Sequence, residues 1–264
     1  MTVRSFSLDA VSLSKSYGRT RVFENISFSI ATGESAAFTG PNGSGKSTLC
    51  DIAAGIRRPG RGTISHYLNG APLQGESLLR VTGLAAPRVN PYDELTGMEN
   101  VRFAARAREA DPLAAAPLFE FFGLARHRDK LLRHYSSGMR QRLKLILSVL
   151  HDPALLILDE PAGGLNERES DELMDIIREI RDSGITVFLI EHDMRVVMGI
   201  SDHVAVMEYG RKISEGTPEE VQKDPAVIEA YLGTDDEDEQ AEAQADARLE
   251  ADARVEAEAG ESVQ

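Results

Sequence analysis

Hydrophobic and polar residues alternate near the start of the chain, and continuous hydrophobic runs appear further on. The alternation covers residues 6–13 and 22–30, which predicts two strands that each bury one face. A short apolar run at 36–38 predicts a further strand, and the continuous runs at 154–158 and 185–190 predict strands buried on both faces, as in the middle of a parallel sheet. A central parallel strand delivers the residues that follow it to the ligand-binding edge of the sheet. The pattern therefore predicts an α/β fold.

The hydrophobic period becomes helical between about residues 96 and 150. This part is rich in alanine, and larger apolar residues recur at helical spacing: Val101, Phe103, Leu118, Phe119 and Phe122. Breaks at Asp111-Pro112 and Gly123 divide the stretch into separate helices. We expect the phenylalanines to lie in the core, and we interpret about 96–150 as a helical insertion between strand-rich parts. Other helices are predicted at 167–182, at 194–200 and after Thr217.

The stretch Gly40–Thr48 carries the strongest chemical signal in the sequence. Two glycines separated by four residues precede Lys46 and Ser47, with a strand-like run before them and a helical start after them. Glycines let the backbone turn its amides around a polyphosphate, and the following helix adds the positive end of its dipole. Lys46 is expected to reach the terminal phosphates, and Ser47 to ligate the magnesium ion that they carry. The predicted nucleoside triphosphate site comprises Gly40, Asn42, Gly43, Ser44, Gly45, Lys46, Ser47 and Thr48.

Acidic residues follow the predicted central strand directly. Asp159 suits magnesium binding, and Glu160 suits the polarisation of an attacking water. His192 follows the next buried strand, so it is expected at the same edge, where it could contact a γ-phosphate. Tyr17 has two interpretations: it is either a core residue or an aromatic platform on which a base stacks.

The order of these motifs resembles the ATP-binding cassette (ABC) ATPases over about residues 6–233. In chain order they are Tyr17, the loop 40–48, Ser136-Ser137-Gly138-Met139, Asp159-Glu160, Gly164-Leu165-Asn166 and His192. The resemblance implies a P-loop NTPase fold with a mixed sheet core, an N-terminal antiparallel β subdomain and an inserted α-helical subdomain. Residues 135–147 look like the haem-exporter group. Residues 190–233 look like branched-chain amino-acid importers.

The resemblance also implies roles for individual residues. Tyr17 would stack on adenine, Lys46 would bind the β- and γ-phosphates, and Ser47 and Asp159 would hold Mg²⁺. Glu160 would be the general base and His192 the γ-phosphate sensor. The implied assembly is a head-to-tail dimer, with itself or with a second cassette, that sandwiches two ATP molecules. In it, the signature Ser136, Ser137, Gly138 and Met139 of one subunit would cap the γ-phosphate bound by the other, since amides at a helix N-terminus form an anion site.

Three departures from the family pattern stand out. The family usually has a magnesium-binding Gln near Pro87, and none is present there. The signature reads Tyr-Ser-Ser-Gly-Met rather than the commoner Leu-Ser-Gly-Gly-Gln, and the usual Asp of the dimer-contact loop is Asn166. The other hydrolytic residues remain, so we expect ATP hydrolysis.

Charge is distributed unevenly along the chain. The net charge is −14, and residues 234–264 contain 12 acidic and 2 basic residues, a net of −10. The remaining body is not basic, which argues against a nucleic-acid-binding protein. We expect the Ala- and Glu-rich tail 234–264 to be disordered or transiently helical. It is either a solubilising appendage or an autoregulatory arm.

Two isolated residues, Cys50 and His66, have side chains that can act as nucleophiles or metal ligands. Cys50 is expected to be a packed small residue rather than a nucleophile. His66 has no partner at ligand spacing, so we expect it at the surface or in a turn rather than on a metal.

The leading functional hypothesis is the energising ATPase subunit of a transporter whose membrane-spanning permease subunits are separate chains. No run of about 18 apolar residues is present, as a spanning helix would need. The expected location is cytoplasmic, peripheral on the inner face of the cell membrane. The alternative is a soluble ABC ATPase that serves an assembly complex, such as iron–sulfur cluster assembly. A purely structural cassette without hydrolysis is a third hypothesis.

Overall fold

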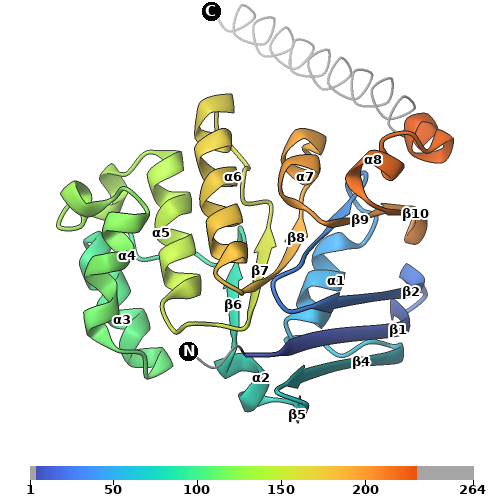
Figure 1. Ribbon diagram of the computed structural model, residues 1–264, viewed down its shortest axis with the longest axis horizontal. Coiled ribbons are helices and arrows are strands. Elements are labelled where there is room, and N and C mark those ends of the chain that lie inside the picture. Colours follow the sequence, from blue (N-terminus) through green and yellow to red (C-terminus); the bar gives the residue numbers. More distant parts are fainter. Residues whose placement is uncertain (1–3, 231–264) are drawn as a thin grey trace, which may run out of the picture.

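The computed structural model describes residues 4–230, and two β-sheets form its core (Figure 1). The first is a four-stranded antiparallel sheet in the order β2-β1-β4-β5. Its strands are β1 (Phe6–Tyr17), β2 (Thr20–Ala31), β4 (Arg61–Leu68) and β5 (Ala71–Leu73). The buried face of β1 changes from Phe6, Leu8 and Ala10 to Leu13, because a register shift with Ser12 at φ 51° inserts one residue.

The second sheet has six strands in the order β10-β9-β3-β8-β7-β6. The strands are β3 (Ser35–Thr39), β6 (Thr82–Ala85), β7 (Leu155–Asp159), β8 (Thr186–Ile190), β9 (His203–Glu208) and β10 (Arg211–Gly216). All neighbours pair in parallel except the edge strand β10. Every residue of β3, β7 and β8 is buried, as the unbroken hydrophobic runs of β7 and β8 predict. The mixed sheet and the antiparallel sheet confirm the predicted α/β class.

Alternate residues of this sheet belong to two different hydrophobic clusters. Leu156 and Leu158 pack with the helical cluster, which includes α5 (Ser137–Val149), α6 (Glu167–Asp182) and α7 (Met194–Ile200) (Figure 1). Leu155 and Ile157 pack with the cluster of α1 (Lys46–Ala53) and the antiparallel sheet. The six-stranded sheet is therefore covered on both faces.

Three phenylalanines fasten the antiparallel sheet to the six-stranded one. The ring of Phe28 on β2 meets that of Phe38 on β3 edge-on, with centroids 4.8 Å apart. Phe38 stacks on Phe188 of β8 at 5.1 Å. Such aromatic pairs add about 0.5–1.5 kcal/mol beyond the area that they bury. These contacts hold β3, the strand that leads into the phosphate loop, against the antiparallel sheet and against β8.

The helical stretch begins with α3 (Gly97–Arg108) and α4 (Ala115–Phe121), both of which pack against α5. Phe119 and Phe122 are buried, as predicted. The prediction for Phe103 is wrong: its residue is 54% exposed and its ring packs edge-on against Tyr92. Val101 and Ala105 face the core, and a residue midway between them on a helix points to the opposite side.

Short elements complete the chain: α2 (Glu76–Arg80), α8 (Pro218–Val221) and three 3₁₀ turns at Pro112–Ala114, Ala125–His127 and Leu132–His134. Thr217 caps α8, as expected. The surface position expected for His66 is wrong, because its side chain is buried and its Nε2 lies 2.8 Å from the Ala53 carbonyl oxygen.

The acidic tail 234–264 lies outside the described residues, so its two interpretations and the domain boundary at residue 233 stay predictions. Between residues 4 and 230, no helix has the length and hydrophobicity that crossing a bilayer requires.

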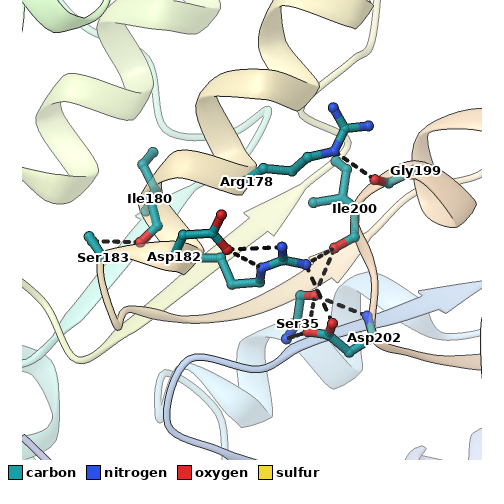
Figure 2. Close-up of polar contacts among 9 residues, drawn as sticks. Ser35, Arg178, Ile180, Asp182, Ser183, Gly199, Ile200 and Asp202 are labelled. Atoms are coloured by element: carbon teal, nitrogen blue, oxygen red, sulfur yellow. Dashed lines mark hydrogen bonds and ion pairs between the residues drawn. The ribbon is translucent and has the colours of Figure 1, made fainter.

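Figure 2 shows the junction that holds the end of β3 opposite the phosphate loop. Ser35 Oγ lies 2.7 Å from both the Ile200 carbonyl oxygen and Asp202 Oδ2, and the Ser35 amide donates to the same carboxylate at 2.8 Å. Arg178 of α6 donates to the Gly199 carbonyl at 2.9 Å. These bonds join the start of β3 to the ends of α6 and α7.

We predict that Ser35→Ala lowers the free energy of unfolding by about 1–3 kcal/mol, because buried partners lose a hydrogen bond. Urea unfolding followed by circular dichroism measures the change. Ser29→Ala is the matched control: its hydroxyl donates to Asp9 Oδ1 at 2.7 Å, but at an exposed position. The control is expected to change stability by no more than about 0.5 kcal/mol. Equal unfolding midpoints for the two variants would contradict the assigned role of the junction.

Candidate functional site

The phosphate loop, residues 40–48, connects the end of β3 to the start of α1. Gly40 has φ 133°, and a Cβ there would lie 1.9 Å from the Met207 carbonyl oxygen, so only glycine fits. Gly45 takes a left-handed conformation at the N-cap of α1, and no side chain caps this helix. The first turn of α1 also contains no acidic residue. Its N-terminal amides and helix dipole are therefore available to an anion.

Lys46 is buried within this loop. Its Nζ donates to the carbonyl oxygens of Gly40 at 2.7 Å and Pro41 at 2.9 Å. Burial lowers the pKa of Lys46, and the nearby carboxylates of Glu160, Asp159 and Glu191 oppose that shift. The Ser44 hydroxyl is buried and has no hydrogen-bond partner among the described residues. A phosphate group would satisfy both kinds of donor, so the loop fits a nucleoside triphosphate.

The carboxyl end of β7 brings Asp159 beside this loop. Asp159 is only 4% exposed, and its Oδ1 accepts a hydrogen bond from Ser47 Oγ at 3.4 Å. Burial, reinforced by the charge of Glu160, raises the pKa of Asp159. A hydroxyl and a carboxylate are the oxygen ligands that Mg²⁺ prefers, so the two predicted metal ligands fit the ion.

Glu160 follows in a strained conformation, with φ 51°. Such a backbone costs about 1–3 kcal/mol and persists only where neighbours hold it. The Glu160 amide donates to the Ile190 carbonyl at 2.9 Å, and Gln141 of α5 donates to the Pro161 carbonyl at 2.8 Å. The predicted base therefore stands on a turn that β8 and α5 fix from two sides.

Glu191 is a residue of this edge to which sequence reasoning assigned no role. It is 1% exposed, and its carboxylate accepts from the amides of Ala162 at 2.9 Å and His192 at 3.0 Å. It thereby ties the segment after Glu160 to the segment after β8. Burial raises the pKa of Glu191. The available signal was its position: it follows a buried strand directly, as Asp159 ends one.

His192 and Tyr17 both have exposed side chains. His192 Nδ1 lies 3.5 Å from Glu191 Oε2, at the edge predicted for it. Tyr17 is 44% exposed, which excludes the core interpretation. Lys15 Nζ and the Arg57 guanidinium each lie 5.4 Å from the centre of its ring. An aromatic ring near two cations suits an electron-rich base next to a phosphate chain.

The signature residues lie at the N-terminus of α5. Ser136 is the N-cap, and its hydroxyl accepts from the Met139 amide at 3.3 Å. Ser137 is exposed, while Gly138 is buried where a Cβ would meet the Glu169 carboxylate at 2.6 Å. Among the described residues, no hydrogen bond or ion pair connects 136–139 to the phosphate loop. The structure thus brings the loop, Asp159, Glu160 and His192 to one edge but leaves the signature apart from them.

Comparison with known proteins identifies the family. The model of the family described as ABC transporter matches residues 23–163, more than half of the chain. The chain belongs to the ABC transporter family. It is an ATP-binding and ATP-hydrolysing member. A second model, described as branched-chain amino acid ATP-binding cassette transporter, matches residues 211–237 and agrees with the predicted likeness of the C-terminal part. The haem-exporter likeness of the signature stays a prediction.

Relatives of this ABC ATPase span most of its length. The high-affinity branched-chain amino acid transport ATP-binding protein LivG of Salmonella typhimurium is 34% identical over 241 residues, covering 82% of this chain and 94% of LivG. The daunorubicin/doxorubicin resistance ATP-binding protein DrrA of Streptomyces peucetius is 33% identical, covering 90% of this chain and 73% of DrrA.

Solved structures support the fold. The ADP conformation of an ATP-binding cassette of an ABC transporter superposes with a TM-score of 0.76 at 24% identity, covering 86% of this chain and 99% of that one. CbiO1 of Clostridium perfringens, part of the ABC transporter complex cbiONQ, is 28% identical with a TM-score of 0.72, covering 84% and 92%. The architecture of this ABC ATPase is therefore that of known cassettes.

We predict that Gly40→Ala disrupts the phosphate loop far more than Gly43→Ala does. A methyl group at residue 40 would overlap the backbone of β9, whereas the space around Gly43 is open. Gly43 also has a positive φ of 82°, so the control bears backbone strain of about 1–2 kcal/mol but no clash. Urea unfolding and binding of a fluorescent ATP analogue measure both effects. Equal losses in the two variants would refute the close packing of the loop on β9.

Proposed function

We propose that this ABC ATPase supplies the energy for a transporter whose membrane-spanning subunits are separate chains. The carrying observation is a full set of phosphate, base and sensor residues at one sheet edge, within a described part that has no helix able to cross a bilayer. In this arrangement the protein works in the cytoplasm, peripheral on the inner face of the cell membrane through its permease partners. The names of its relatives favour a transporter over an assembly complex.

The membrane partner, and not this subunit, selects the transported substrate in this proposal. Relatives of similar identity include a branched-chain amino acid transport protein and a Nod factor export protein of Sinorhizobium fredii. Proteins named for transport and for export thus share a comparable likeness to this chain, so the cassette alone does not select a substrate.

For nucleotide binding, we assign Tyr17 to stacking on adenine and the loop 40–48 to the phosphates. The uncapped N-terminus of α1 and the unpartnered Ser44 hydroxyl support that assignment, since both offer donors to an anion. Lys46 exchanges its two loop carbonyls for the β- and γ-phosphates.

For hydrolysis, Ser47 and Asp159 would hold Mg²⁺, which neutralises charge on the phosphates when bound. Glu160 acts as the general base that takes a proton from the attacking water, and the backbone turn on which it stands is held by the Ile190 carbonyl and by Gln141. His192 contacts the γ-phosphate, with its backbone amide held by Glu191.

A second copy completes each site in this proposal. The signature Ser136, Ser137, Gly138 and Met139 presents the N-terminus of a 13-residue helix, with Ser137 exposed and no acidic residue in its first turn. The amides and dipole at this N-terminus can bind an anion. A head-to-tail dimer, with itself or a second cassette, would place it on the γ-phosphate of the partner.

We predict that Glu160→Gln slows ATP hydrolysis about 100-fold or more, because the amide cannot accept the proton of the attacking water. The same variant is expected to accumulate as an ATP-bound dimer, since opening after hydrolysis is blocked. Phosphate release and size-exclusion chromatography with ATP measure the two effects. Glu179→Gln on the exposed face of α6 is the control. A variant that hydrolyses ATP at the wild-type rate would eliminate Glu160 as the base.

We also predict that two inactive variants regain activity when mixed. Lys46→Ala disables the phosphate loop, and Ser137→Arg blocks the signature. In a head-to-tail dimer a mixed pair has one doubly damaged site and one intact site, so an equal mixture should recover up to about one quarter of the wild-type sites. Failure to recover activity, although mixed dimers form, would exclude sharing of the site between subunits.

A further inference from the structure

The positively charged guanidinium of Arg88 lies close to Asp159, the carboxylate assigned to magnesium. Arg88 follows β6, the parallel neighbour of β7, so it reaches the same sheet edge as Asp159. Its Nη1 lies 3.7 Å from Asp159 Oδ2, while Ser47 Oγ bonds the other oxygen, Oδ1. Its Nη2 pairs closely with Asp51 of α1.

A guanidinium cannot substitute for the amide that the family usually carries near Pro87. It has only donors and stays protonated in proteins, so it cannot ligate a metal ion. Its positive charge also repels a divalent cation that approaches the same carboxylate. Arg88 and the metal are therefore competitors for Asp159, whereas a glutamine would be a shared ligand.

Asp51 is a second carboxylate with which Arg88 can stay paired when it leaves Asp159. Its carboxylate is largely buried and also accepts from Arg57 Nε at 3.3 Å and Nη2 at 3.2 Å. Arg88 contacts Asp51 more closely than Asp159, so it can release Asp159 and remain paired. Arg88 is therefore ion-paired both when it contacts Asp159 and after a metal ion has displaced it.

We propose that Arg88 is a positioning residue that holds Asp159 before the metal arrives and weakens metal binding at this site. The inference rests on the proposed metal role of Asp159. By linkage, a bound metal ion weakens the contact of Arg88 with Asp159 by the same free energy by which Arg88 weakens metal binding.

The test compares Arg88→Met, which removes the charge without adding an oxygen ligand for the metal, with the wild-type full chain, using a fluorescent, non-hydrolysable ATP analogue as the probe. Affinity is measured once with Mn²⁺ and once with EDTA. We expect Arg88→Met to bind the Mn²⁺-loaded analogue about tenfold more tightly, as changes next to metal ligands often alter metal affinity by that much. Affinity in EDTA is expected not to rise, because a positive charge near the phosphates is lost. Thermal unfolding without nucleotide or metal should occur at a lower temperature, because the buried Asp159 loses a counter-charge.

Arg57→Met is the matched control, because Arg57 shares Asp51 but makes no ion pair with Asp159 among the described residues. Since Arg57 also lies beside the Tyr17 ring, the quantity compared is the ratio of the affinities with Mn²⁺ and with EDTA. An equal gain in this ratio in both variants would attribute the effect to general charge removal and overturn the proposal. Weaker Mn²⁺-dependent binding in Arg88→Met would overturn it too, since Arg88 would then bind phosphate. If Mn²⁺ changes the affinity of neither wild type nor variant, the proposed metal role of Asp159 is refuted. If Mn²⁺ raises the affinity of wild type and of the Arg88 variant by the same factor, the metal role of Asp159 stands and only the competition with Arg88 is refuted.

Discussion

Parallel pairing of β3, β7 and β8 is the constraint on which the site depends. Backbone hydrogen bonds align the three strands, so their carboxyl ends reach one edge although they are far apart in sequence. The phosphate loop, the pair Asp159-Glu160 and the segment Glu191-His192 all leave from that edge. A strand shifted by one residue would turn its side chains to the other face, and the two hydrophobic clusters resist this because alternate residues belong to each. Packing thereby sets the positions of the chemical groups.

Burial of opposite charges is the second constraint. Lys46, Asp159 and Glu191 are all largely buried, and each is held by backbone groups or a neighbouring side chain. Burial lowers the pKa of the lysine and raises those of the two acids, because it disfavours the charged form of each group. The charges of Asp159 and Glu191 oppose the shift of Lys46. A nucleotide that adds negative phosphates and a divalent cation changes this balance, which gives the nucleotide-bound and nucleotide-free states different preferred contacts.

Sequence reasoning predicted most of this organisation because it rests on local signals. The runs at 154–158 and 185–190 and the helices 167–182 and 194–200 agree with β7, β8, α6 and α7. Residues whose roles depend on distant contacts were placed wrongly or missed. Nothing in the sequence around His66 indicates that this side chain reaches the Ala53 carbonyl, and Phe103 fits the helical period without facing the core. Arg88 was missed because nothing local indicates that the loop after β6 folds back to Asp51 and Asp159.

Local contacts accommodate two of the three departures from the family pattern. Asn166 serves as the N-cap of α6 and accepts from the Glu169 amide at 2.9 Å. The Glu169 carboxylate also adjoins Gly138, so the signature and the start of α6 are packed as one unit. Near Pro87 a cation replaces a neutral ligand and pairs with acids on α1 and β7. The phosphate loop keeps the full pattern, and at Gly40 the carbonyl of Met207 leaves no room for a side chain. At the positions of Asn166 and Arg88, by contrast, the departing side chain has a partner nearby.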